Sequence, residues 1–149
     1  MNEAKHENWT KHFLGREISY PAEYVIKIFK GKYPNLNLSQ NGFVGKKICD
    51  FSCGDGRHLQ FFKNCGFDVY ATEISEGLVK IVSDNIKPLD LDMRVGNNIK
   101  NPFSDSFFDY FLSWNACYYM DDNLDFDIHV REIARTIKKG GGEADYVCT

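Results

Sequence analysis

The pattern of apolar and polar residues switches repeatedly between a helical period and strand-like runs along this chain. A first amphipathic helix is predicted behind Pro21 from apolar positions at helical spacing, namely Tyr24, Val25, Ile28 and Phe29. The apolar run at 46–51 then predicts a short buried strand that ends in a glycine-bearing turn. Helical spacing returns at 59–62, and Gly66 is a typical C-terminal cap for that second helix.

The same switching continues through the second half of the chain. Three further strands are predicted, at 67–72, 91–95 and 107–114. Between the first two of them, Ser75 is the predicted N-cap of a helix that Pro88 stops. A last helix is predicted over 121–139, because acidic residues open it and basic residues close it, as the helix dipole favours. Its buried stripe is expected to comprise Phe126, Val130, Ile133 and Ile137.

This order of elements predicts the fold class. Strands that alternate with helices at this spacing imply right-handed crossovers and a mostly parallel sheet with helices on both faces. We therefore expect a Rossmann-like α/β fold. No repeat or low-complexity linker divides the 149 residues, so we expect a single domain, with a helical N-terminal cap segment at 1–45 and a Rossmann-like core at 46–149.

Composition narrows the classes of partner. A formal net charge of -3, without a run of Lys or Arg, argues against nucleic acid and against an anionic membrane surface, and leaves small polar substrates. The sequence has no signal-peptide core and no apolar stretch long enough to span a bilayer, so we expect a cytoplasmic protein. We expect reduced thiols and no metal site, because no C-x-x-C pair occurs among Cys49, Cys53, Cys65, Cys117 and Cys148.

The sharpest chemical signal is the turn at 50–56, Asp-Phe-Ser-Cys-Gly-Asp-Gly, between a strand and a helix. Glycines there let the backbone approach a ligand closely, although such a turn alone can be a mere connection. Glu73 strengthens the ligand interpretation, because a carboxylate at the end of the next strand can accept hydrogen bonds from both hydroxyls of a ribose. Its negative charge also disfavours a ligand with a 2′-phosphate.

With these motifs, the sequence resembles the class I, seven-strand S-adenosylmethionine-dependent methyltransferases over nearly its whole length. The resemblance rests on four segments in the order of the family: ICDFSCGDG, VYATEIS, VGNNIKNPFSDSFFDYFLSWNA and VREIARTIKKGGG. One departure is Ser52, which stands where the family usually has the first glycine of acid-x-Gly-x-Gly-x-Gly.

The resemblance implies S-adenosylmethionine as the cofactor and assigns roles around it. The turn at 50–56 would surround the methionine moiety, Glu73 would bind the ribose, and Ile74 would pack against the adenine. Asn97 stands where the family often has an acid that accepts from the adenine amino group, a bond that an amide oxygen can also accept. The expected cofactor-binding set is Asp50, Ser52, Cys53, Gly54, Gly56, Glu73, Ile74, Asn97, Asn98, Ser113, Trp114, Asn115 and Tyr20.

No local pattern fixes a catalytic base. The candidates are Tyr118 and Tyr119, which follow the fourth predicted strand, and His12, in the N-terminal segment that in this family often closes over the cofactor. For His58 and His129 we expect solvated helix faces.

Two related functions fit the sequence motifs less well. A dinucleotide-binding protein would carry the motif G-x-G-x-x-G, but Leu59 occupies the position of the third glycine. NAD therefore remains a minor alternative. A DNA-base aminomethyltransferase would carry Asn/Asp-Pro-Pro-aromatic after the fourth strand, where this chain has Ser-Trp-Asn-Ala. The expected activity is methyl transfer to an oxygen or nitrogen of a small polar metabolite or sugar-like acceptor.

The C-terminal sequence departs from the family pattern. After Gly140-Gly141-Gly142 the family continues with an apolar fifth strand, a helix and an antiparallel strand pair, whereas this chain reads EADYVCT. We therefore expect a sheet without its last strands. The chain would be a cut-down, a naturally minimal or a frame-shifted form of the family. A bare sheet edge would invite self-association. The alternative functions are a catalytically weak or inactive cofactor-binding domain, or a subunit whose pocket a partner completes.

Overall fold

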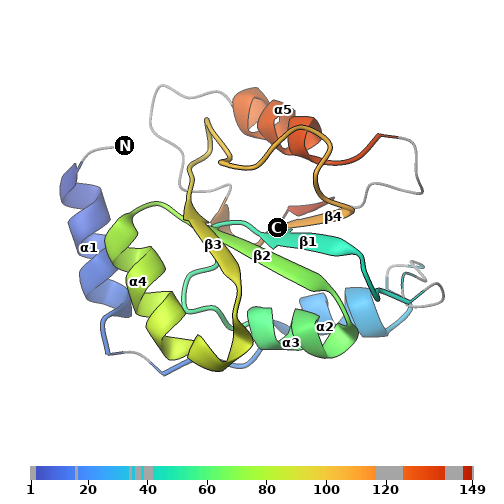
Figure 1. Cartoon of the computed structure of the whole chain (residues 1–149), viewed down its shortest axis with the longest axis horizontal. Coiled ribbons are helices and arrows are strands. Elements are labelled where there is room, and N and C mark those ends of the chain that lie inside the picture. The colour runs from blue at the N-terminus through green and yellow to red at the C-terminus, as the bar shows by residue number, and fades with distance from the viewer. Residues whose placement is uncertain are drawn as a thin grey trace.

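A five-stranded sheet with every neighbouring pair parallel forms the centre of the molecule (Figure 1). The computed structural model describes residues 3–15, 17–33, 35, 38, 42–116, 126–139 and 146–148. The strands are β1 (Lys47–Asp50), β2 (Asp68–Glu73), β3 (Asp92–Val95), β4 (Tyr110–Ser113) and β5 (Tyr146–Cys148). Their spatial order is β3-β2-β1-β4-β5, so the chain reverses direction across the sheet between β1 and β4. This arrangement confirms the predicted Rossmann-like α/β fold, and such a switch point is where open parallel sheets bind ligands.

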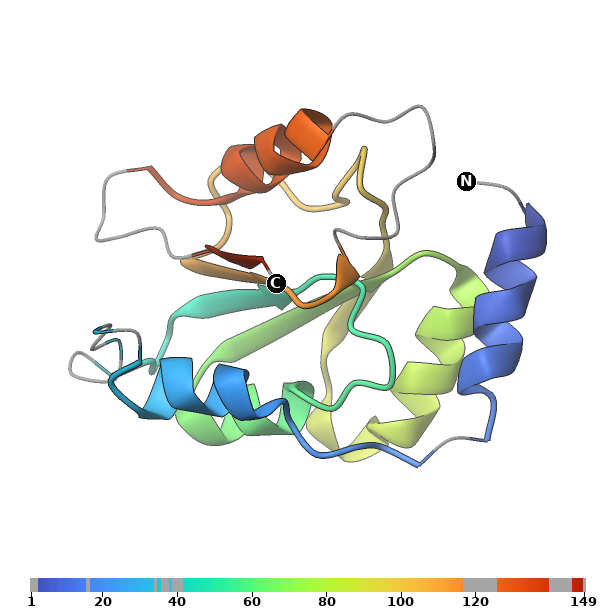
Figure 2. The same ribbon diagram turned by 180° about the vertical axis from the view of Figure 1, so that it is seen from behind.

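Helices cover both faces of this sheet (Figures 1 and 2). They are α1 (Glu3–Phe13), α2 (Glu23–Lys30), α3 (Leu59–Cys65), α4 (Glu76–Asn85), the short 3₁₀ helix η2 (Lys87–Leu89) and α5 (Phe126–Thr136). The helix α5 lies on one face, whereas α2, α3 and α4 lie on the other, and α1 packs beside α4. The apolar pattern predicts no helix over Glu3–Phe13, because that segment is mostly polar.

The predicted helix ends at Gly66 and Ser75 are confirmed. Gly66 ends α3 in the left-handed region, with a φ of 98°. The side chain of Ser75 caps α4 by accepting a hydrogen bond from the backbone N–H of Leu78. Both signals are local in sequence, which is why they are readable without the fold.

Two buried apolar clusters hold the helices on the sheet. One lies on the side of α2 and α3 and is rich in edge-to-face aromatic pairs around Phe29, Phe62 and Phe67. The other includes Phe108 and Phe111 and packs against Ile133 of α5. Alternate residues of a strand serve the two clusters, as the side chains of Ile48 and Cys49 in β1 show.

The buried side of α5 differs from the predicted stripe. Phe126 is 47% exposed, and the buried side chains of the helix are His129, Ile133 and Thr136. The expectation that His129 is a surface residue is therefore wrong: its Nε2 lies 3.2 Å from the hydroxyl of buried Ser113 in β4. This contact satisfies one ring nitrogen and makes burial of a polar ring tolerable. Burial in turn lowers the pKa of His129.

The polar C-terminal sequence does form a strand. Residues Tyr146–Cys148 pair with β4 in parallel register, with Phe111 opposite Tyr146. The fifth position of the sheet is thus occupied, although the composition of EADYVCT argues against a central strand.

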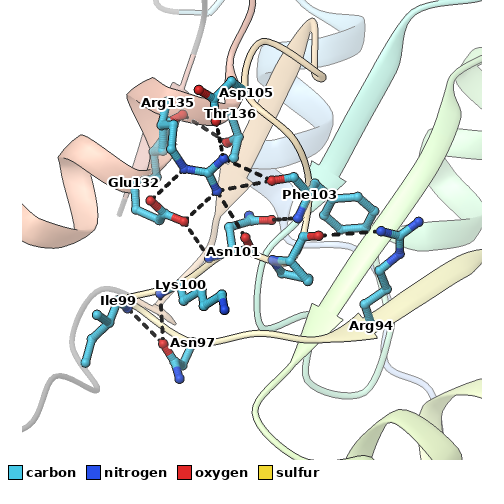
Figure 3. Close-up of polar contacts among 12 residues, drawn as sticks. Arg94, Asn97, Ile99, Lys100, Asn101, Phe103, Asp105, Glu132, Arg135 and Thr136 are labelled. Atoms are coloured by element: carbon cyan, nitrogen blue, oxygen red, sulfur yellow. Dashed lines mark hydrogen bonds and ion pairs between the residues drawn. The ribbon is translucent and has the colours of Figure 1, made fainter.

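Arg135 of α5 ties the long connection between β3 and β4 to that helix (Figure 3). Its guanidinium donates to both carboxylate oxygens of Glu132, to Asp105 at 2.6 Å, and to the carbonyls of Asn101 and Phe103 at 3.1 Å. Glu132 in turn accepts from the backbone N–H of Asn101 at 2.7 Å. One side chain therefore fixes the path of the segment that leaves the end of β3.

We expect Arg135→Ala to lower the free energy of unfolding by about 2 kcal/mol, because it leaves buried carbonyls without their donors. Urea unfolding measures this loss. Arg131→Ala is the matched control, since Arg131 lies on the same helix and forms one exposed ion pair with Asp127 at 3.9 Å. Equal effects of the two substitutions would show that the Arg135 contacts do not hold the connection.

Candidate functional site

A cavity of about 360 Å³ opens at the carboxyl ends of β1, β2 and β4, next to the switch point of the sheet. Its size falls in the range of small-molecule sites. The lining residues come from α1, the end of β1 and the turn after it, the end of β2, α4, the segment after β3 and the end of β4. They are Trp9, His12, Phe13, Asp50, Ser52, Cys53, Gly54, Asp55, Arg57, His58, Glu73, Ile74, Leu78, Asn98, Trp114, Asn115 and Ala116.

The turn after β1 is fastened to the end of β2. The backbone N–H of Ser52 donates to the hydroxyl of Thr72, and the N–H of Cys53 donates to the Thr72 carbonyl. Ser52 has a φ of 52°, so the serine adopts the left-handed conformation that the glycine of the family pattern would take more easily. Ser52 therefore adopts at this position a backbone conformation that is open to glycine without strain.

The two glycines of the turn serve different purposes. Gly54 lines the cavity, and a Cβ added to it would meet the ring of Phe13 at 3.3 Å. Gly56 faces the core instead, where an added Cβ would lie 3.0 Å from Val82 and 3.2 Å from Leu59. Gly54 therefore keeps the cavity open, whereas Gly56 lets the turn pack closely on α4.

Glu73 ends β2 as a buried carboxylate on the cavity wall, 3% exposed. Its Oε1 accepts from the backbone N–H of Gly54 at 2.6 Å, and its Oε2 accepts from the N–H of Ile74 at 3.2 Å. Burial raises the pKa of Glu73 to about 7, and the two backbone hydrogen bonds oppose that rise. The carboxylate is thus fixed in place and titrates near neutral pH.

Asp50 and His58 form a buried pair on the same wall. Nδ1 of His58 lies 3.4 Å from Oδ2 of Asp50, and the two residues are 2% and 1% exposed. The expectation of a solvated His58 is wrong, because its ring packs between Phe62 and the edge of Trp114. The sequence offers no periodic signal for this burial, since His58 belongs to the turn before α3.

The N-terminal segment closes one side of the cavity. Trp9 and Phe13 of α1 stack with their rings 6.0 Å apart, and His12 lies edge-on to both. Asp55 fastens the segment after α1, because its carboxylate accepts from the backbone N–H of Ser19 at 3.2 Å and from Arg57. Trp9 and Phe13 are not among the predicted site residues, although aromatic residues four apart in a polar segment are a signal for such a wall.

Most of the predicted cofactor-binding residues meet at this cavity. Those that line it are Asp50, Ser52, Cys53, Gly54, Glu73, Ile74, Asn98, Trp114 and Asn115, together with the candidate base His12. Tyr118 and Tyr119 lie outside the described residues.

The structure places four of the predicted residues away from this cavity. Gly56 packs against α4, and Tyr20 is 92% exposed. Asn97 is exposed, and its side-chain oxygen accepts from the backbone N–H groups of Ile99 and Lys100, so it caps a turn. Ser113 points to the opposite face, toward His129.

Across the described residues, no group of three or more His, Cys, Asp or Glu side chains is arranged to hold a metal ion. None of the helices found there has both the length and the apolar character needed to cross a membrane.

Comparison with known protein families identifies a methyltransferase domain. The family described as "Methyltransferase domain" matches residues 49–142, which is more than half of the chain. A search of curated proteins finds no match.

Solved structures share the fold. A complex between the Haloferax volcanii Trm112 methyltransferase activator and a candidate methyltransferase matches with 25% identity and a TM-score of 0.60, over 93% of this chain and 51% of the other. A candidate S-adenosyl-L-methionine-dependent methyltransferase from Methanococcus maripaludis is 20% identical, with a TM-score of 0.61 over 93% and 58%. The [4+2]-cyclase SpnF is 24% identical, with a TM-score of 0.57 over 66% and 37%. This chain thus spans between 37% and 58% of the length of these structures.

Proposed function

Since this chain belongs to the class I S-adenosylmethionine-dependent methyltransferase family, we propose that its cavity binds S-adenosylmethionine and that it transfers the methyl group to a small acceptor. The acceptor atom is an oxygen or a nitrogen on a polar metabolite or a sugar-like molecule. The observation that carries the proposal is Glu73, a buried carboxylate held beside the turn after β1 at the switch point of the sheet.

Each end of the cofactor has a complementary wall. The Glu73 carboxylate would accept from the two ribose hydroxyls, a bond for which an ionised acid is the better acceptor. Ile74 and Leu78 line the cavity as apolar surface for the adenine. Asn98 takes the role that the sequence assigned to Asn97, because its neighbour caps a turn while Asn98 is buried on the cavity wall. Gly54 leaves room for the methionine chain.

The chemistry of transfer asks little of the protein beyond alignment. The sulfonium of the cofactor makes its methyl group electrophilic, so holding the acceptor in line supplies much of the catalysis. Trp9, Trp114 and Asn115 also line the cavity and would position the acceptor. His12 is the base that we propose for an acceptor that must lose a proton, because it is exposed to solvent and lines the same cavity.

Calorimetric titration of the chain with S-adenosylmethionine, S-adenosylhomocysteine and NAD tests the proposal. We expect binding of the first two at about micromolar dissociation constants, near -8 kcal/mol, and none of NAD. Glu73→Ala should weaken binding at least about tenfold, through loss of charge-assisted hydrogen bonds. Glu76→Ala is the control, because Glu76 is an exposed acid three residues further along.

Each other outcome selects a different function. A folded chain that binds NAD but neither sulfur ligand would refute the proposal. Binding of the cofactor without methyl transfer to any tested acceptor would favour a binding domain, or a subunit that needs a partner. The SpnF likeness makes this arm necessary, because one fold supports several chemistries.

A further inference from the structure

His129 of α5 is a buried ring that contacts two elements of the cavity from outside it. The residue is 1% exposed and does not line the cavity. Its Nε2 lies 3.2 Å from the hydroxyl of Ser113 at the end of β4, and its ring centroid lies 5.3 Å from that of Phe51. Phe51 opens the turn after β1, and its backbone N–H donates to the carbonyl of Leu112 in β4 at 2.9 Å. The imidazole therefore packs where the turn after β1 meets the end of β4.

Both of these elements continue into cavity residues that have an unfavourable backbone conformation. Ser52 follows Phe51 and has a φ of 52°, and Asn115 lies two residues after Ser113 with a φ of 60°. Both residues line the cavity. Residues other than glycine keep the left-handed conformation only where the surrounding structure holds them in it. The neighbours of these two residues must therefore be held firmly, and His129 contacts one neighbour of each.

A polar ring is a costly choice at this position. Nδ1 of His129 is buried, and within the described part of the chain it has no hydrogen-bond partner. An apolar ring would pack beside Phe51 without that cost. What the imidazole adds is the hydrogen bond to Ser113, which an apolar ring cannot form. The function of His129 should therefore depend on this hydrogen bond.

We infer that His129 is a positioning residue for binding of the cofactor, an inference that rests on the proposed function. Through Ser113 it fixes the end of β4, and through Phe51 it fixes the turn after β1. These two walls of the cavity thereby keep a fixed separation. The helix α5 contributes to binding in this way from the opposite face of the sheet, without a side chain in the cavity.

A double substitution separates positioning from stability. His129→Phe combined with Ser113→Ala replaces both partners of the hydrogen bond by apolar groups, so the double variant should resist urea at least as well as the unsubstituted chain. We expect it to bind S-adenosylhomocysteine about 5- to 10-fold more weakly, which is about the effect of one hydrogen bond. His129→Gln keeps a hydrogen-bonding atom near the position of Nε2 and should recover part of this affinity.

Ile133→Val is the matched control. Ile133 lies on the same buried side of α5, and its substitution removes a buried methyl group but leaves the hydrogen bond between His129 and Ser113 in place. It should therefore lower the stability of the chain and leave its affinity unchanged. An unchanged affinity in the double variant would overturn the inference. An equal loss of affinity in Ile133→Val would overturn it too, because any loosening of α5 would then have the same effect.

A second measurement needs no ligand. The chain has two tryptophans, and Trp114 follows Ser113 directly on the cavity wall. In the NMR spectrum of the isotope-labelled chain, the indole N–H signal of Trp114, assigned with Trp114→Phe, should shift in the double variant and stay in place in Ile133→Val. If the unsubstituted chain binds no S-adenosylhomocysteine, the proposed function is refuted. The indole signal then decides by itself whether His129 positions this wall, and an unchanged signal would overturn that role.

Discussion

Glu73→Gln is expected to stabilise the ligand-free chain above pH 7 while it weakens binding of the cofactor. The buried carboxylate has a pKa of about 7 in the folded chain, against an ordinary value of 4.5. Between these two values the folded chain holds a proton that the unfolded chain has released. The free energy of unfolding therefore falls as pH rises through this window, and it stays lowered above pH 7.

The size of the effect follows from the shift. A rise from 4.5 to about 7 corresponds to about 3 kcal/mol of lost stability. Glutamine has no charge to bury, and its amide oxygen can still accept from the N–H of Gly54, although one of the two backbone hydrogen bonds is lost at about 1 kcal/mol. Glu73→Gln should thus be more stable than the unsubstituted chain by about 2 kcal/mol at pH 8, and no more stable at pH 4.

Urea unfolding of both chains between pH 4 and pH 9 measures this difference, and titration with S-adenosylhomocysteine measures the opposite effect on binding. The affinity of the unsubstituted chain should rise as pH passes 7, because the ionised carboxylate is the stronger acceptor for ribose hydroxyls. Affinity of Glu73→Gln should be low and independent of pH in that range. A stability difference that does not change with pH would mean that Glu73 ionises as an exposed acid does.

This trade-off gives a physical reason for an ionisable residue at a costly position. Glutamine would fill the same space at the end of β2 without the penalty of a buried charge. The carboxylate destabilises the empty chain, and ligand hydroxyls that donate to it recover part of that free energy on binding. The free energy of unfolding therefore differs more between the empty and the occupied site.

The features that could be predicted from the sequence depend on neighbours along the chain. The strands at 46–51 and 67–72, the cap at Ser75 and the turn at 50–56 each have a signal within a few residues. Glu73 could also be assigned to the cavity, because parallel strands end at the same edge of a sheet and β2 lies beside β1. Such inferences need only periodicity and the rules of strand order.

The features that could not be predicted depend on what packs across space. His129 is buried because Ser113 of β4 faces it, and no pattern within α5 announces that partner. The choice between Asn97 and Asn98 depends on how the chain leaves β3. Gly96 permits a close approach there, since an added Cβ would lie 2.8 Å from Pro102, and Arg135 then fixes the path of the segment.

The largest loss of stability is expected from Gly56→Ala. Gly56 has a φ of 78°, in the left-handed region, which costs an alanine about 1 kcal/mol. The new methyl group would also lie 3.0 Å from Val82 and 3.2 Å from Leu59, and overpacking of this kind costs about 1–3 kcal/mol. Together these effects predict a loss of about 3 kcal/mol in the free energy of unfolding, measured with urea.

Gly45→Ala is the control that separates the two effects. Gly45 has nearly the same backbone conformation, with a φ of 74°, but an added Cβ there meets no atom within 4 Å. Its substitution should therefore cost only the conformational part, about 1 kcal/mol. If both alanines cost the same, the contact of the turn with α4 is not tight, and Gly56 is needed for its backbone angle alone. If Gly56→Ala lowers the free energy of unfolding by more than Gly45→Ala does, the additional loss comes from the packing of Gly56 against α4. Gly54 is then the glycine of the turn that the ligand requires.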